Sequence, residues 1–280
     1  MTEIFKRPRV VQAWMAAARH LARQKRQHDR NIILEITSPQ TFTADDREIV
    51  RLVDVALQRK NAARSVMTAA GTIFPQRIYQ HYGRPEWYSK YQAIIARGKA
   101  KGTWGTYTLR MIHRVGPDGE VFNPLEKIIE KLSSRREANQ TKYAAAYELS
   151  TIDPAEDFED PTAGFGYELP TYDPATDRNS YMGSPCLSHV TFKLMDNKVD
   201  LTAIYRSHYY AERALGNLIG LAQLQNYVAR EAGYEPGVLT CVSTYAKLDP
   251  GLGGIVAARD LLAALPADEP ITAAKPAPAA

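Results

Sequence analysis

Residues 184–233 carry the clearest secondary-structure pattern of the chain and read SPCLSHVTFKLMDNKVDLTAIYRSHYYAERALGNLIGLAQLQNYVAREAG. Polar and apolar residues alternate over 189–194, which is typical of a strand with one buried face. A second strand is expected over 200–205, after a short polar turn, so the two segments predict a β-hairpin. A long helix is expected next, over 211–232, and Gly233 fits the left-handed conformation that often ends a helix.

The rest of the chain mixes helical and strand periodicities. Four further helices are predicted, over 10–27, 45–59, 86–98 and 124–132. Three further strands are predicted, over 32–36, 143–149 and 238–243. Residues 101–114 are expected to be extended. Because helices and strands do not alternate strictly, we expect an α/β or α+β fold, a mixed β-sheet flanked by helices.

Two segments stand apart in composition. Residues 151–183 are acidic and contain several prolines and glycines, so a surface insertion is expected there, either a lid or a solvated loop. Residues 266–280 are rich in alanine and proline, which predicts a mobile tail. The remainder, residues 1–265, is expected to form a single domain.

Composition narrows the class of protein. The chain has 280 residues, a net charge of +4, 45% hydrophobic and 24% charged residues, which is an ordinary globular profile. The small positive excess suits an anionic ligand. Nucleic-acid binding through the basic face of the 10–27 helix is a weaker alternative, because no recognisable motif accompanies it. No apolar run approaches the roughly 20 residues that span a membrane, and no signal-peptide pattern follows the basic start.

Only two cysteines occur, Cys186 and Cys241, without the spacing of a metal site or of a disulfide framework. We therefore expect no metal and a reduced, cytoplasmic setting. A cysteine on a strand is most often buried and inert, and Cys241 is interpreted in that way.

Cys186 stands in register with three other polar residues. Pro185 and Cys186 precede the first hairpin strand, Arg206 and Ser207 follow 20 residues after the cysteine (206 − 186), and Asn217 follows 31 residues after it (217 − 186). This arrangement resembles the core of thymidylate synthase, in which a Pro-Cys nucleophile, an Arg-Ser pair and a pyrimidine-binding Asn have these spacings. The resemblance is specific over residues 184–249 and looser around Tyr107.

The resemblance implies a transferase that acts on a pyrimidine nucleotide, dUMP or a close analogue. Cys186 would add to C6 of the base, and C5 would then accept a one-carbon unit from 5,10-methylenetetrahydrofolate. Such a thiol ionises only with positive charge nearby, which Arg206 could supply while binding the phosphate. Ser207 would donate to the phosphate, and Asn217 would face N3–H and O4 of the base.

The same resemblance implies further nucleotide-binding residues and a homodimer. In the family, two adjacent arginines of the partner subunit reach the phosphate. Arg136, which follows Arg135, and Lys142 are the candidates here, although a surface charge run is the ordinary interpretation. Arg30 is a candidate for a mobile phosphate-binding arginine. Tyr107 and Lys247 are the remaining candidates for nucleotide-binding residues.

Four departures limit the resemblance. The family keeps a catalytic Glu on an early helix, whereas residues 61–82 contain no Asp or Glu. Leu187 stands where a His is usual, Tyr209 stands where an Asp is usual, and Lys247–Asp249 replaces a sugar-binding His-x-Tyr. Glu86, or a carboxylate of the acidic insertion, could substitute for the Glu.

These departures leave several outcomes open. The product could be a methyl group, formed with a hydride from the folate, or a hydroxymethyl group, formed with water. The alternative is a catalytically impaired homologue that binds a nucleotide in a regulatory role.

Overall fold

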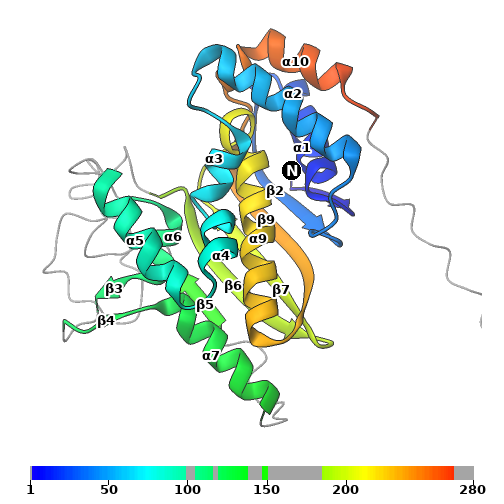
Figure 1. Ribbon diagram of the computed structural model, residues 1–280. Helices are drawn as coiled ribbons and strands as arrows, with labels where there is room; N and C mark the ends of the chain where they lie inside the picture. The colour runs from blue at the N-terminus through cyan, green and yellow to red at the C-terminus, as the bar shows by residue number, and fades with distance from the viewer. Residues whose placement is uncertain (1, 99–104, 116–118, 138–146, 151–184, 268–280) are drawn as a thin grey trace, which may run out of the picture.

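The computed structural model describes residues 2–98, 105–115, 119–137, 147–150 and 185–267 (Figure 1). The acidic segment 151–183 and residues 268–280 of the predicted tail lie outside these ranges. None of the helices within them is both long enough and apolar enough to cross a membrane.

A mixed β-sheet forms the centre of the molecule. Its strands follow the order β1-β2-β9-β7-β6-β5, and the short β8 pairs with β9. The β1–β2, β7–β9 and β8–β9 pairs are parallel, and the other pairs are antiparallel. The strand bounds are β1 Glu3–Arg7, β2 His28–Ile36, β5 Tyr147–Ser150, β6 Leu187–Met195, β7 Lys198–Tyr205, β8 His208–Tyr209 and β9 Glu235–Lys247. The predicted fold class is confirmed.

Helices pack on this sheet and on one another. In Figure 1, α9 and the short helices α3 and α4 lie in front of β7 and β9. The helix bounds are α1 Val10–Arg23, α2 Ala44–Lys60, α3 Val66–Gly71, α4 Gln76–Tyr82, α5 Glu86–Gly98, α6 Tyr107–Ile112, α7 Pro124–Glu137, α9 Leu215–Ala232 and α10 Ile255–Ala264. A π-helical turn η2 (Tyr210–Ala214), a 3-10 turn η3 (Pro250–Leu252) and a small hairpin, β3 (Arg114–Val115) with β4 (Val121–Phe122), complete the fold.

The helix α9 is buried nearly throughout, and α3 lies very close to it. A Cβ atom placed on Gly216 would lie 2.3 Å from the carbonyl oxygen of Val66, and one on Gly220 would lie 2.7 Å from that of Ala70. Both glycines are therefore required for this approach, because a real Cβ does not come within 3.0 Å of backbone.

The two faces of the sheet differ. Residues that point toward the helices, such as Leu34, Cys241 and Ala203, are fully buried. Alternate residues on the opposite face are only half-buried in the described structure. We call this the open face and define it by five residues, Ile33, Thr202, Ile204, Thr240 and Val242.

Most of the predicted elements are confirmed. The hairpin, the helix over 86–98 and the left-handed Gly233 (φ +79°) are present. The helix expected over 10–27 ends at Arg23, since Gln24 is already extended. Of the strand expected over 143–149, only its last three residues lie within the described ranges.

The extended conformation expected for residues 101–114 is wrong in its described part. Tyr107–Ile112 forms the helix α6. The Thr106 side chain caps it by accepting a hydrogen bond from the Leu109 N–H at 3.2 Å. All but one of its residues are buried, so the amphipathic pattern that identifies a surface helix is absent.

Candidate functional site

The candidate site lies at one end of the central sheet. Strands β7 and β9 end there, and β2 and β6, which run antiparallel to them, begin there. The register joins Leu187 to Tyr205, Tyr205 to Ser243, and Ser243 to Ile32 across four strands. Residues just beyond this row therefore gather at one end of these four strands, although they are far apart in the sequence.

Hydrogen bonds of its backbone hold Cys186 at this end of the sheet. It is half-buried and directly precedes β6. Its N–H donates to the Tyr107 hydroxyl at 3.2 Å, and the Leu187 N–H donates to the same oxygen at 3.3 Å. Its carbonyl accepts a hydrogen bond from the Arg206 N–H at 3.0 Å. Tyr107, on α6, thus lies against the backbone of the segment that carries the thiol.

Arg206 lies in the turn that follows β7. Its Nε donates to the Pro185 carbonyl at 2.9 Å, which brings the guanidinium beside the segment that carries the thiol. The Thr244 hydroxyl fixes the turn by donating to the carbonyls of Tyr205 (3.1 Å) and Arg206 (3.3 Å). Ser207, next in the chain, is half-buried.

Charge and burial act in opposite directions on the thiol. Burial raises the pKa of Cys186, and the guanidiniums of Arg206 and Arg213 oppose that rise without cancelling it. The thiol is therefore mostly protonated at neutral pH, and the expectation that the charge of Arg206 ionises it is not met in this structure. Cys241 is fully buried, and burial raises its pKa to about 12, in agreement with an inert residue.

Arg213 is a site residue that the sequence does not reveal. It lies on the π-helical turn η2 and is exposed, with no ion pair to another residue in the described ranges. Its neighbour Glu212 forms ion pairs with Arg64 and with Lys60 (3.8 Å). The sequence pattern is that of a continuous helix through 211–232, so nothing in it marks the turn that presents Arg213.

Asp249 holds this π-helical turn in place. Its buried carboxylate accepts hydrogen bonds from the Ala211 N–H at 2.9 Å and the Gly251 N–H at 3.2 Å. Burial raises its pKa. The N–H groups that it accepts from lie on or beside η2 and η3, so Asp249 supports the turn that carries Arg213.

Asn217 is buried on α9, and its partner is His208. The Asn217 Nδ2 lies 3.2 Å from His208 Nε2, and His208 Nδ1 lies 2.9 Å from Ser243 Oγ. The His208 ring stacks on Tyr205, with centroids 3.9 Å apart and planes 4° from parallel. Burial lowers the pKa of His208 to about 3, so its ring is neutral at ordinary pH.

The other predicted site residues are only partly brought together. Arg30 is exposed on β2 opposite Tyr245, and Lys247 is half-buried on β9 opposite His28, both at the same sheet end as Cys186. The side chain of Arg136 and all of Lys142 lie outside the described residues. Tyr209, where an Asp was expected, is 45% exposed.

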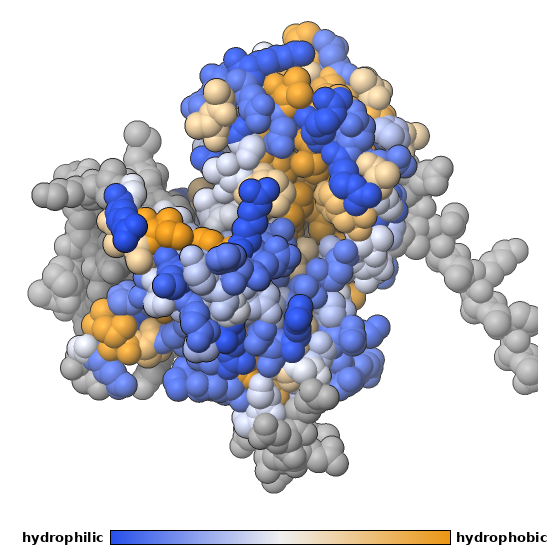
Figure 2. Space-filling model, viewed as in Figure 1, coloured by the Kyte–Doolittle hydropathy of each residue, from blue (hydrophilic) through white to orange (hydrophobic). Residues whose placement is uncertain are grey.

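Three cavities are lined by described residues, and the linings of these three contain neither Cys186, Arg206 nor Asn217. One of about 570 Å³ is lined by Glu86, Tyr88 and Phe122 among others. No described contact links Glu86 to Cys186. Another, of about 390 Å³, is lined by Val10 and Ile219 among others, in the region where Figure 2 shows apolar surface between α2 and α9.

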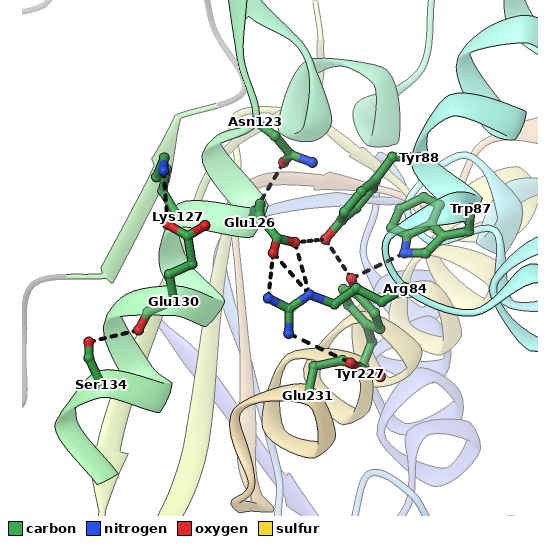
Figure 3. Close-up of polar contacts among 10 residues, drawn as sticks. All are labelled: Arg84, Trp87, Tyr88, Asn123, Glu126, Lys127, Glu130, Ser134, Tyr227 and Glu231. Atoms are coloured by element: carbon green, nitrogen blue, oxygen red, sulfur yellow. Dashed lines mark hydrogen bonds and ion pairs between the residues drawn. The ribbon is translucent and has the colours of Figure 1, made fainter. Parts of the chain in front are cut away.

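A polar network fixes the helices around α6. In Figure 3, Arg84 points at Glu126 on α7, with Nε 3.0 Å from both carboxylate oxygens. The Tyr88 hydroxyl donates to Glu126 at 2.6 Å and lies 2.6 Å from the Tyr227 hydroxyl on α9, which also accepts from Trp87 Nε1 at 3.1 Å. The network ties α5 and α7 to α9, and α6 lies between α5 and α7 in the chain.

Comparison with known proteins supplies short matches. No family model matches the chain. Two relatives named "Putative thymidylate synthase", from Methanosarcina mazei and Methanosarcina acetivorans, are 47% and 45% identical over 62 residues, 22% of this chain. A protein of the same name from Methanothermobacter thermautotrophicus is 29% identical over 159 residues, 57% of each chain. The matches span 29% of the length of the first two relatives. The chain is thus similar over limited segments to proteins that carry that name.

Proposed function

We propose that this chain transfers a one-carbon unit to C5 of a pyrimidine nucleotide, dUMP or a close analogue, through a covalent adduct between Cys186 and C6. The observation that carries the proposal is the convergence of Cys186, Arg206 and Tyr107 at one sheet end, joined by hydrogen bonds of 2.9–3.3 Å. The limited similarity to proteins named as thymidylate synthases supports the same chemistry.

Each residue has a role in this proposal. The Cys186 sulfur forms a bond to C6, and the electron pair of the C5–C6 double bond moves toward C5 and O4. Asn217 stabilises the charge that develops on the base. Arg206 and Ser207 bind the phosphate, and Arg30 and Lys247 extend the positive rim that receives it. Arg213 remains to stabilise the thiolate once the phosphate has neutralised Arg206.

A folate needs a cavity lined by apolar and aromatic side chains. A cavity of about 470 Å³ is lined by Phe74, Ile78 and Tyr91. The Tyr91 hydroxyl is hydrogen-bonded to Thr106, which directly precedes Tyr107. We propose that this cavity holds the flat part of 5,10-methylenetetrahydrofolate. The bound folate would supply the one-carbon unit.

The second candidate function is nucleotide binding without turnover. Two observations favour it: the thiol of Cys186 is protonated by burial, and segment 61–82 contributes no carboxylate. Loss of general acid–base help alone costs about 10²–10⁴-fold in rate. Glu212, the carboxylate closest to Arg213 in sequence, is already paired with Arg64.

A homodimer is the proposed assembly. The open face is continuous across β2, β9 and β7, and is flanked by the Lys6–Glu35 ion pair (2.5 Å) on one side and the Glu148–His189 pair (2.6 Å) on the other. A half-buried face with an apolar centre and charged edges suits association with a second copy.

Release of tritium from [5-³H]dUMP tests the proposed function. The assay contains the full chain, the nucleotide and methylenetetrahydrofolate, and substitution at C5 releases the label to water. Release by the wild type, its loss in Cys186→Ala and its retention in Cys241→Ala are expected. Binding of dUMP without release would favour the second candidate. Dihydrofolate formation then distinguishes a methyl from a hydroxymethyl product.

A further inference from the structure

A cavity of about 390 Å³ is lined by the start of α1, the loop before α2, and the helices α2, α3 and α9. Figure 2 shows apolar surface in this region. Its lining residues Val10, Ile219 and Ala222 are 1%, 8% and 4% exposed, whereas Phe42 and Met67, at its rim, are 38% and 46% exposed. The cavity therefore has an apolar interior that is open to solvent on one side.

This cavity differs from the one proposed for the folate, with which it shares only Met67 and Gln223. The folate cavity is lined by the aromatic rings of Phe74 and Tyr91. In the cavity beside α2 the apolar side chains are aliphatic, apart from Phe42 at the rim. Such a lining offers no pair of rings for stacking, and it favours a hydrocarbon chain over a flat heterocycle.

The walls of the cavity are fixed by hydrogen bonds. Gln40 Nε2 donates to the Ala222 carbonyl at 2.8 Å, which joins the loop before α2 to α9. The Thr43 side chain caps α2 by accepting a hydrogen bond from the Asp46 N–H at 3.2 Å. A ligand that enters does not have to order this loop, so that cost is absent from its binding free energy.

Arg47 is the only ionisable residue in this lining. It is exposed, and no ion pair joins it to another residue within the described ranges. Its Nη1 donates to the Phe42 carbonyl at 3.4 Å, a long hydrogen bond that places the guanidinium at the rim. The nearby Glu48 is paired with Arg51. Most N–H donors of Arg47 are thus available to an anion.

An apolar interior with one cation at its rim suits an amphipathic anion. Each methylene group buried in the interior raises the affinity about fourfold. A carboxylate at the rim can accept two parallel hydrogen bonds from a guanidinium. Small-molecule sites have volumes of roughly 300–1,000 Å³, and this cavity lies near the lower limit, so its ligand is small.

We propose that this cavity binds a medium-chain aliphatic carboxylate, with the hydrocarbon chain against Val10, Ile219 and Ala222 and the carboxylate on Arg47. The site is additional to the proposed nucleotide and folate sites, and the inference does not depend on the proposed function.

Titration of the full-length, ¹⁵N-labelled protein with octanoate, hexanoate and 1-octanol tests the inference, with the amide signals of Ile219 and Ala222 as the readout. Octanoate should bind more tightly than 1-octanol, although burial alone would favour the uncharged alcohol. It should bind about tenfold more tightly than hexanoate, which is two methylene groups shorter. Arg47→Gln should weaken octanoate binding by about 5- to 10-fold and leave that of 1-octanol unaltered. Arg51→Gln, the same change outside the lining, should alter neither.

Phe42→Glu provides a second variant at an exposed position. Its carboxylate would pair with Arg47 and repel the ligand, so octanoate binding should be lost. Absence of octanoate binding, equal affinity for octanoate and 1-octanol, or an unchanged affinity in Arg47→Gln would overturn the inference. Displacement of octanoate by methylenetetrahydrofolate would assign the cavity to the folate, and loss of a dimer in Phe42→Glu would assign it to contact between two copies. Either result would also overturn the inference, whereas absence of tritium release from dUMP would bear on the proposed function alone.

Discussion

At the residue scale, the environment of Cys186 combines a desolvated thiol with two nearby guanidiniums. Its backbone is fixed on both sides by Tyr107 and Arg206, so the main chain that carries the thiol has a defined position before any ligand binds. Burial keeps it protonated, and positive charge offsets part of that effect. The thiol is thus protected from indiscriminate reaction and depends on its surroundings for activation.

Loss of the Arg213 charge should make Cys186 less reactive. The guanidinium lowers the pKa of the thiol, so Arg213→Gln should move the pH profile of alkylation by iodoacetamide to higher pH. At a fixed pH below the pKa, a shift of one unit corresponds to about tenfold less thiolate. Arg213→Lys, which keeps the charge, should restore most of the rate. An unchanged profile in Arg213→Gln would show that this charge does not act on the thiol.

Sequence could predict only part of this environment. The spacing of Cys186, Arg206 and Asn217 predicts correctly that Cys186 and Arg206 lie together, because a hairpin returns the chain to the start of its first strand. Arg213 and His208 carry no such signal. Their positions depend on a π-helical turn and on the approach of β9, which are set by tertiary packing.

At the scale of elements, the close approach of α3 to α9 depends on two glycines. Gly216→Ala should destabilise the protein by about 1–3 kcal/mol, because its Cβ would meet the Val66 carbonyl at 2.3 Å. Gly71→Ala is the matched control, since nothing lies within 4 Å of its Cβ, and its stability should not fall. Urea unfolding measures both. Equal stability of the two variants would contradict the account of this contact.

The Arg84–Glu126 ion pair should make the stability of the folded protein depend on pH. Although burial opposes it, hydrogen bonds from Arg84 and Tyr88 lower the pKa of Glu126 below 4.5 in the folded state. This stabilisation is present above pH 4.5 and is lost as the pH falls through the lowered pKa. Glu126→Gln should therefore cost about 1.5–3 kcal/mol at pH 7 and progressively less below pH 4.5.

The control for this pair is Glu130→Gln, in the same helix. Glu130 is 49% exposed and pairs with Lys127, so its loss should change stability by less than about 1 kcal/mol at either pH. Thermal unfolding from pH 3 to pH 8 distinguishes the two cases. A cost of Glu126→Gln that did not vary with pH would exclude the proposed linkage.

Some helices and strands can be predicted from the sequence and others cannot, and the difference lies in how each is buried. Strands β6 and β7 and the helix α5 each have one face toward the core, and that contrast is visible as periodicity. The helix α6 is buried on nearly all sides, so its sequence lacks the contrast, and only its Thr106 cap marks its beginning.

At the scale of the whole molecule, the open face suits pairing with a second copy. A dimer is expected in sedimentation velocity at micromolar concentration. Val242→Lys should dissociate it, because a charge at the centre of the open face would be desolvated in the interface. Val256→Lys introduces the same charge at a residue that is 72% exposed on α10, and the dimer should persist. A wild-type monomer would count against this assembly.

The proposed organisation of the chain remains a single domain over 1–265, with 151–183 as an insertion and 266–280 as a tail. In its support, the buried residues from Val10 to Leu265 form one hydrophobic cluster that joins the sheet to its helices. Sequence could predict this class of fold, since hairpin, helix and strand periodicities are local. It could not predict the strand order, which places β9 between β2 and β7.

Attack of Cys186 on C6 of a pyrimidine nucleotide would leave a covalent adduct, which intact-protein mass spectrometry detects. The full chain is incubated with 5-fluoro-dUMP or 5-fluoro-dCMP, with and without methylenetetrahydrofolate. We expect a covalent adduct that is lost in Cys186→Ala and kept in Cys241→Ala. A protein that binds the nucleotide but forms no adduct under any of these conditions, or an adduct that survives in Cys186→Ala, would contradict it.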